Sequence, residues 1–375
     1  MNRAEIEKDV LDWMAESPWV PDSARFEALA LALFRFQFAS CEPYANFCRS
    51  FERTPENVER FEEIPAVPTG AFKEFDLCCF DPKATVQLFR TSGTSSDRRG
   101  LLRLDTLRLY EASLLASLRE TFLRDLKGAR PVMRFLSPTP EEAPDSSLTH
   151  MFVTLLASEA GAGSGFDLRD ERIDFDSLDR ARRKAGEGGR PILILGTSFA
   201  FVHFLDETAG SATDTWSLPK NSRIMETGGF KGRSREVPRE KLRRDLADRF
   251  DIPETSILNQ YGMTELGSQF YDSTLLDPSG TRRKLAPPWT RVRIIDPTTA
   301  EDVADGDTGM IVIHDLANTG SIAAIQTADL GCAVLDDSGE RIGFDILGRF
   351  EGAEERGCSI ATDIMLEASA RRMLV

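Results

Sequence analysis

The stretch TSILNQYGMTELG (residues 255–267) begins as a short apolar run and ends in a polar loop. The apolar run predicts a strand, and the loop after it presents Tyr261, Thr264 and Glu265 close together. A tyrosine ring offers a flat face to a nucleobase, a threonine hydroxyl binds phosphate, and a carboxylate oxygen is a ligand that Mg²⁺ prefers. The same residues also suit an ordinary strand-end turn with one exposed acid, so both interpretations stay open.

A second polar loop, Thr91-Ser92-Gly93-Thr94-Ser95-Ser96, follows a strand predicted at residues 84–89. Several hydroxyl groups surround one glycine, so the backbone can bend and its N–H groups can converge on phosphate oxygens. Arg98 and Arg99 follow and add positive charge. The loop is not a Walker loop, because the GK[ST] element is missing. A surface turn rich in Ser and Thr is the alternative.

A third loop, Thr327-Ala328-Asp329-Leu330-Gly331, lies downstream and is followed by Gly348-Arg349. An aspartate at a strand end can accept hydrogen bonds from both ribose hydroxyls, and a nearby arginine can add a ribose or phosphate contact. An ordinary aspartate in a β-turn is the commoner alternative for a lone Asp-Leu-Gly.

Between these loops, predicted strands alternate with predicted helices, which indicates an α/β fold with layers joined by crossover connections. Strands are predicted at 131–138, 191–197 and 222–230. Helices are predicted at 105–126, 146–160, 198–209 and 239–250, the first with Asp105 as its N-cap. Ligands of open α/β sheets bind at the carboxyl ends of the strands, where all three polar loops begin.

Three parts are expected along the chain. Residues 1–60 predict a helical segment, in which Pro18 and Pro21 separate two helices. Residues 61–348 predict the core, and its last part, from about 285 to 348, is β-rich. Residues 349–375 form a short tail.

Composition excludes several classes of protein. The 375 residues are 41% hydrophobic and carry a net charge of −15, which argues against a broad surface for nucleic acid or anionic membrane. No stretch approaches the ~18–20 apolar residues of a membrane span, and the N-terminus lacks an apolar signal core, so we expect a cytoplasmic protein. The six cysteines form no CxxC pair, which favours free thiols over a zinc site.

The order of the motifs resembles the adenylate-forming superfamily: TSGTSS, TGGF, YGMTE, TADLG and Gly348-Arg349. The resemblance implies the fold of that superfamily's large N-terminal domain, with ATP and Mg²⁺ as cofactors. It places Ser92, Thr94 and Ser95 on the β- and γ-phosphates and Thr264 on the α-phosphate. Glu265 would bind the metal, Tyr261 and Gly229 would flank adenine, and Asp329 and Arg349 would hold the ribose. The matched motifs add Thr91, Gly93, Gly228, Phe230 and Gly262 to the ATP-binding set.

The pieces VPTGAFKEF, DSSLTHM and EERGCS resemble the acyl-protein synthetase family of bacterial bioluminescence, from about residue 60 to 362. This implies that a fatty acid is activated, is carried on the protein's own cysteine and serves a reductase partner. Cys358 is the candidate carrier. Arg356 favours its thiolate, whereas Glu354 and Glu355 oppose it; a small buried hydrophobe is the alternative. Candidates for the acid pocket, fatty or aryl, are His150, Gly196, Thr197, Phe199 and His203.

Two departures from the superfamily pattern keep other hypotheses open. Ala328 replaces a glycine, and residues 349–375 contain no lysine to assist adenylation, so Arg98, Arg99, Lys73 or a partner would have to act instead. Coenzyme A or a carrier protein is the alternative acyl acceptor, with a transferase as the alternative partner. A catalytically degenerate nucleotide-binding scaffold in a biosynthetic complex is the alternative of another class.

Overall fold

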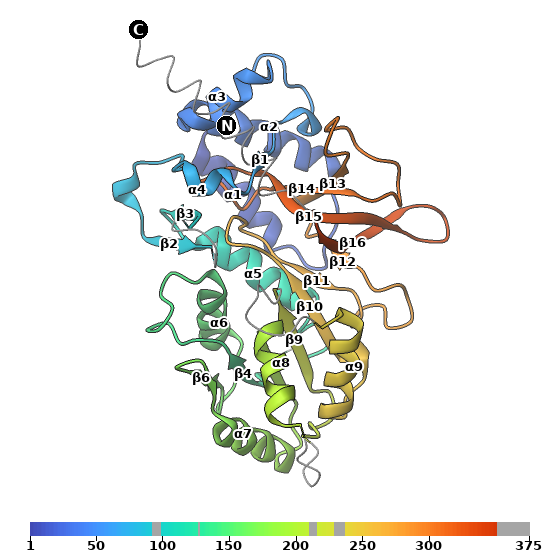
Figure 1. Cartoon of the computed structure of the whole chain (residues 1–375). Helices are drawn as coiled ribbons and strands as arrows, with labels where there is room; N and C mark the ends of the chain where they lie inside the picture. Colours follow the sequence, from blue (N-terminus) through green and yellow to red (C-terminus); the bar gives the residue numbers. More distant parts are fainter. Residues whose placement is uncertain (92–98, 127, 210–215, 229–236, 351–375) are drawn as a thin grey trace. The chain divides into compact units, whose positions relative to one another are not determined.

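A computed structural model describes residues 1–91, 99–126, 128–209, 216–228 and 237–350. These residues form two compact units (Figure 1). Within the described ranges, the first unit takes residues from 1–120, 263–270 and 283–350, and the second takes residues from 121–262 and 271–282. The three-part division of the sequence at residues 60 and 348 stays a prediction. No helix among the described residues has both the length and the apolar character of a membrane span.

The first unit opens with the predicted helices, in blue in Figure 1. Asn2 caps helix α1 (Arg3–Met14) in a capping box with Glu5, and Asp22 caps α2 (Ser23–Ser40). The two prolines lie between these helices, as predicted. The remaining helical elements of this unit are α3 (Glu42–Ser50), η1 (Phe61–Glu63), α4 (Ala71–Glu74), η2 (Pro82–Ala84) and α5 (Arg108–Glu120).

The predicted β-rich part is present in the same unit. Strands β13 (Thr290–Ile295), β14 (Gly309–Asp315), β15 (Ala324–Leu335), β16 (Arg341–Arg349) and β12 (Lys284–Leu285) pair antiparallel in that order. Strand β1 (Val67–Pro68) adds a parallel pairing with β15. Strands β2 (Gln87–Arg90) and β3 (Leu101–Leu104) form a separate antiparallel hairpin. β14 is buried along its whole length and lies between β13 and β15.

The second unit has the expected α/β layering. Strands β10 (Ile257–Tyr261), β9 (Arg223–Thr227), β8 (Ile192–Thr197), β4 (Val132–Leu136) and β5 (Gly165–Phe166) pair parallel in that order. Helices α7 (Phe175–Glu187), α8 (Ser198–Glu207) and α9 (Arg239–Phe250) share a core with β8, β9 and β10, and Figure 1 shows α8 and α9 lying along these strands. The unit also contains α6 (Ser147–Ser158), β6 (Leu168–Arg169), β7 (Arg172–Ile173) and η3 (Glu254–Ser256), and the chain passes between the units within β11 (Phe270–Asp272).

Two local predictions are wrong. Asp105 is not the N-cap of a helix: α5 begins at Arg108, and the Asp105 carboxylate instead accepts two hydrogen bonds from the Arg3 guanidinium, at 2.6 and 2.7 Å. The strand predicted at 84–89 begins only at Gln87, because Pro82 starts a 3₁₀ turn that Asp81 caps.

His314 makes stability depend on pH. The imidazole lies in β14, is buried, and its Nε2 has no hydrogen-bond partner among the described residues. Burial, reinforced by the Arg293 charge, lowers the pKa of His314 to about 3. The unfolded pKa is about 6.5, so between these two pH values the unfolded chain binds more protons than the folded chain. The contribution of His314 to the free energy of unfolding is therefore fully present above about pH 6.5 and is progressively lost as the pH falls below that value.

We expect His314→Leu to weaken this acid sensitivity. Urea unfolding of both proteins between about pH 7 and pH 5 should show a drop in unfolding free energy that is smaller in the variant by about 1–2 kcal/mol. Parallel pH profiles for the two proteins would contradict the assignment.

Candidate active site

The hairpin of β2 and β3 holds the two ends of the predicted phosphate loop together. Thr91 N donates to Gly100 O at 3.0 Å, and Gly100 N donates to Thr91 Oγ1 at 2.9 Å. The loop between them is therefore anchored at a strand end, as predicted. Its central candidates lie outside the described residues: Ser92, Gly93, Thr94 and Ser95.

Thr264 lies beside the strand that leads into this loop. Its Oγ1 donates to the carbonyl oxygen of Arg90 at 3.4 Å, and Arg90 directly precedes Thr91. Glu265 is buried, with 6% of its surface exposed, and its backbone carbonyl accepts a hydrogen bond from Asn318 Nδ2 at 2.7 Å. The first unit thus brings the Thr-Glu motif to the base of the phosphate loop, although the two stretches lie far apart in the sequence.

Asp329 and Arg349 are brought together by the pairing of β15 with β16. They are direct partners in the register, and Arg349 Nε lies 3.8 Å from Asp329 Oδ1. The Asp329 side chain is mostly covered, whereas 65% of the Arg349 side chain is exposed. The two residues are therefore close enough to contact one ligand, and their contact with ribose stays a prediction.

In the second unit, other candidate residues lie at or directly after the carboxyl ends of three parallel strands, β8, β9 and β10. Gly196 and Thr197 of β8 pair with Glu226 and Thr227 of β9. Gly228 follows with φ of +79°, a conformation that favours glycine. β10 ends at Tyr261, and Gly262 follows it. Gly229 and Phe230 of the adenine-side turn lie outside the described residues.

The candidates for the acid pocket lie on two helices and the end of β8. Thr197 caps α8 by accepting a hydrogen bond from Ala200 N. On α8 the rings of Phe199 and His203 stack with centroids 6.3 Å apart, and His203 Nε2 lies 3.1 Å from a carboxylate oxygen of Glu207. His150 lies in α6. The role of these residues toward an acid stays a prediction.

A buried glutamate that sequence reasoning missed ties these strand ends together. Glu226 accepts a short hydrogen bond from Ser198 Oγ at the start of α8, and a second one from Asn259 Nδ2 of β10 at 2.7 Å. An acidic residue near the end of a predicted strand was the signal, because a buried carboxylate needs donors from its neighbours.

Sequence reasoning also missed a polar network behind Glu265. Asp315, at the end of β14, accepts hydrogen bonds from Ser268 N at 2.8 Å, Ser268 Oγ at 2.7 Å and Ala317 N at 3.0 Å. Burial raises the pKa of the Asp315 carboxyl to about 6, and these hydrogen bonds oppose the rise. Trp289 Nε1 donates to Ser268 Oγ and to Ser113 Oγ, at 3.1 and 3.0 Å. The polar run DLANTG directly after a buried strand was the signal.

Glu265 is the sequence candidate for a magnesium ligand, and this role stays a prediction. No three His, Cys, Asp or Glu side chains among the described residues gather into a metal cage. Mg²⁺ in nucleotide enzymes takes one or two carboxylates together with phosphate oxygens and water, so a site with a single carboxylate, such as the one predicted at Glu265, is compatible with this chemistry.

The fold defines the class of protein. The chain superposes on the solved open-conformation structure of a 2-hydroxyisobutyryl-CoA ligase in complex with 2-HIB-AMP and CoA, with a TM-score of 0.62. The superposition covers 87% of this chain and 75% of that chain at 13% identity, so it establishes the fold alone. The protein has the fold of an adenylate-forming ligase.

The sequence identifies the family. The family described as "Acyl-protein synthetase, LuxE" matches residues 7–367, and the chain belongs to it. Two relatives are long-chain-fatty-acid–luciferin-component ligases. The one from Aliivibrio fischeri is 23% identical over 340 residues, covering 89% of this chain and 87% of the relative. The one from Vibrio harveyi is 22% identical over 338 residues, covering 89% and 86%. The chain is therefore an enzyme that activates a carboxylic acid as its adenylate and passes the acyl group to a thiol.

Arg349→Met should weaken ATP binding. The guanidinium is the charged partner of Asp329 at the proposed ribose site, so its loss should raise the KM for ATP about tenfold while kcat changes less, as expected for one charge-assisted contact. Arg341→Met on the same strand removes an exposed ion pair with Asp305 and is the matched control. Equal ATP KM values in the two variants would refute the ribose role.

Proposed function

We propose that the chain activates a long-chain fatty acid with ATP and Mg²⁺, and then transfers the acyl group to its own Cys358 for delivery to a reductase partner. The observation that carries the nucleotide part is the contact of Thr264 with Arg90, at the base of the predicted phosphate loop. The names of the two luciferin-component ligases support the choice of acid.

In the first half-reaction, a carboxylate oxygen attacks the α-phosphorus of ATP. A new P–O bond forms, the bond from the α-phosphorus to the bridging α–β oxygen breaks, and pyrophosphate leaves with that oxygen. The protein's task is to align the two reactants and to neutralise charge. Thr264 hydrogen-bonds the α-phosphate, the hydroxyls of Ser92, Thr94 and Ser95 bind the β- and γ-phosphates, and Asp329 with Arg349 holds the ribose. Mg²⁺ bound by Glu265 would offset the negative charge on the phosphates.

In the second half-reaction, a thiolate attacks the acyl carbonyl, a thioester forms and AMP leaves with the former carboxylate oxygen. Three of the cysteines, Cys41, Cys48 and Cys79, are buried in the first unit and suit packing better than acyl transfer. Burial also raises the pKa of Cys48 to about 12, which leaves almost no thiolate near neutral pH. Cys358, beside Arg356 in the sequence, is the proposed acceptor; it lies outside the described residues.

Glu265→Gln tests the metal role. The amide keeps the size of the side chain but loses the negative charge that binds Mg²⁺, so fatty-acid-dependent ATP–pyrophosphate exchange should fall at least about a hundredfold. The thermal midpoint should change little. Glu254→Gln, in a 3₁₀ turn of the second unit, is the control with the same chemical change. Undiminished exchange in folded Glu265→Gln protein would remove Glu265 from the mechanism.

Cys358→Ser tests the acceptor. After incubation with fatty acid, ATP and Mg²⁺, intact-mass spectrometry of the wild type should show one added acyl group that neutral hydroxylamine removes. The variant should retain pyrophosphate exchange but lose the hydroxylamine-labile group. Cys78→Ser and Cys332→Ser, at the two partly exposed cysteines among the described residues, are the controls. Labelling that persists in Cys358→Ser, or that requires added coenzyme A or a carrier protein, would overturn self-acylation.

A further inference from the structure

The N-terminal helices carry none of the recognised motifs, yet one of their side chains reaches into the core. Gln37 of α2 is buried, and its carboxamide makes three hydrogen bonds to one backbone turn. Nε2 donates to Asn318 O at 2.8 Å and to Ser321 O at 2.6 Å, and Oε1 accepts from Ala323 N at 3.1 Å. A buried amide that is satisfied so fully by backbone groups fixes the path of the chain it binds. The turn that Gln37 contacts spans residues 315–323 and is called the 315–323 turn.

The other side of this turn holds the loop that carries Thr264 and Glu265. Asn318 Nδ2 donates to Glu265 O at 2.7 Å and to Ile322 O at 3.2 Å. Gly267 packs directly on the turn, since a Cβ at this position would lie 2.8 Å from the Cβ of Ala317. A side chain there would push the two segments apart. The Asp315 carboxylate accepts hydrogen bonds from the backbone N–H and from the hydroxyl group of Ser268, as described above.

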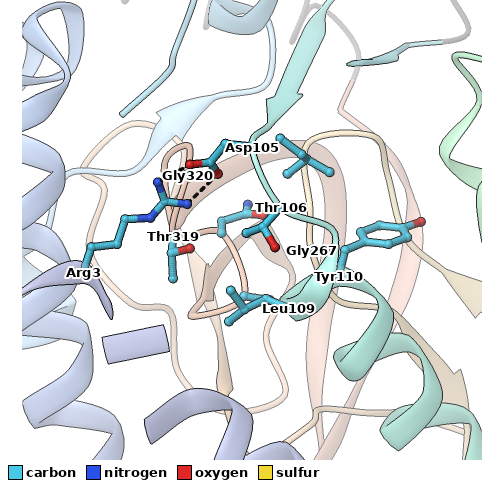
Figure 2. A pocket seen from close by; sticks show the side chains of 11 residues that line it. Arg3, Asp105, Thr106, Leu109, Tyr110, Gly267, Thr319 and Gly320 are labelled. Carbon is cyan, nitrogen blue, oxygen red and sulfur yellow. Dashed lines mark hydrogen bonds and ion pairs between the residues drawn. The ribbon is translucent and has the colours of Figure 1, made fainter. Parts of the chain in front are cut away.

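Helix α1 supports the turn from a second direction. Thr319 Oγ1 donates to Glu7 Oε1 at 2.8 Å, and Arg3 forms its ion pair with Asp105 next to Gly320. Figure 2 shows Arg3, Asp105 and Thr319 around a pocket that Gly267 also lines. The pocket encloses about 10 Å³, roughly room for one water molecule, so it admits no acyl chain. The residues around it come from four segments of the chain: α1, residues 104–110, Gly267 and residues 317–320.

We propose that Gln37 and Asn318 are positioning residues for Glu265, so that the N-terminal helices set the geometry of the metal-binding glutamate through the 315–323 turn. This rests on the proposed role of Glu265. A metal-binding carboxylate must be held within about half an ångström of its productive position. The Glu265 backbone is held in place by Asn318, and the backbone of Asn318 is held by Gln37.

Two substitutions of nearly unchanged size, Gln37→Met and Asn318→Leu, remove these hydrogen bonds. We expect the peptide covering residues 263–268 to exchange its amide hydrogens at least about threefold faster in each folded variant, because its opening becomes easier. We also expect kcat for fatty-acid-dependent pyrophosphate exchange to fall about tenfold, the effect of roughly one hydrogen bond, with the KM for ATP within about twofold. Because both residues act on one segment, the double variant should lose little more than the worse single variant.

Tyr44→Phe is the matched control. It also removes a hydrogen bond of a buried side chain in the N-terminal helices, from Tyr44 Oη to Pro65 O, and it should leave both the 263–268 exchange and kcat unchanged. If Gln37→Met does not fold, Thr319→Val releases the turn from α1 and should show the same two changes at about threefold.

Unchanged amide exchange of residues 263–268 in the folded variants would overturn the proposal, and so would losses in kcat that simply multiply in the double variant. If the wild type shows no pyrophosphate exchange with any acid, the proposed function fails. The amide-exchange comparison then still decides whether Gln37 and Asn318 hold this loop.

Discussion

The buried carboxylate of Asp315 needs hydrogen-bond donors. The groups that donate to it fix the positions of two segments of the chain. Its oxygens accept from the backbone and hydroxyl of Ser268 and from the backbone of Ala317. A buried charge that loses its partners costs several kcal/mol, so these two segments cannot separate without a large loss of stability. The loop that carries Thr264 and Glu265 is fixed at this point to the end of the buried strand β14.

The second unit also has a buried carboxylate near its candidate residues. In the second unit Glu226, near the end of β9, bridges Ser198 and Asn259 on the two neighbouring strand ends. A buried carboxylate at a strand end favours one arrangement of the adjacent segments, because only that arrangement supplies the hydrogen-bond donors that it needs. These buried polar groups thereby keep the backbone around the candidate residues in place.

The sequence predicted the order of strands and helices well, because the spacing of apolar residues and the helix-capping residues act locally. Helices α1 and α2 and the strands of the β-rich part lie where this pattern predicts them. The sequence predicted that Asp329 and Arg349 hold the ribose together; the register of β15 and β16 makes them neighbours, and their role toward ribose stays a prediction. It failed for Asp105, whose partner Arg3 is distant in the sequence. It also missed Gln37 and Asn318, because hydrogen bonds between distant segments leave no periodic trace.

Isotope transfer from the acid tests the central claim, acyl-adenylate formation, most directly. Fatty acid labelled with ¹⁸O in its carboxyl group would be incubated with the protein, ATP, Mg²⁺ and an acyl acceptor, and the released AMP and pyrophosphate analysed by mass spectrometry. Attack of the carboxylate on the α-phosphorus predicts one ¹⁸O atom in each AMP and none in pyrophosphate. Label in inorganic phosphate would indicate an acyl phosphate instead, and thioester formation with unlabelled AMP would contradict the account.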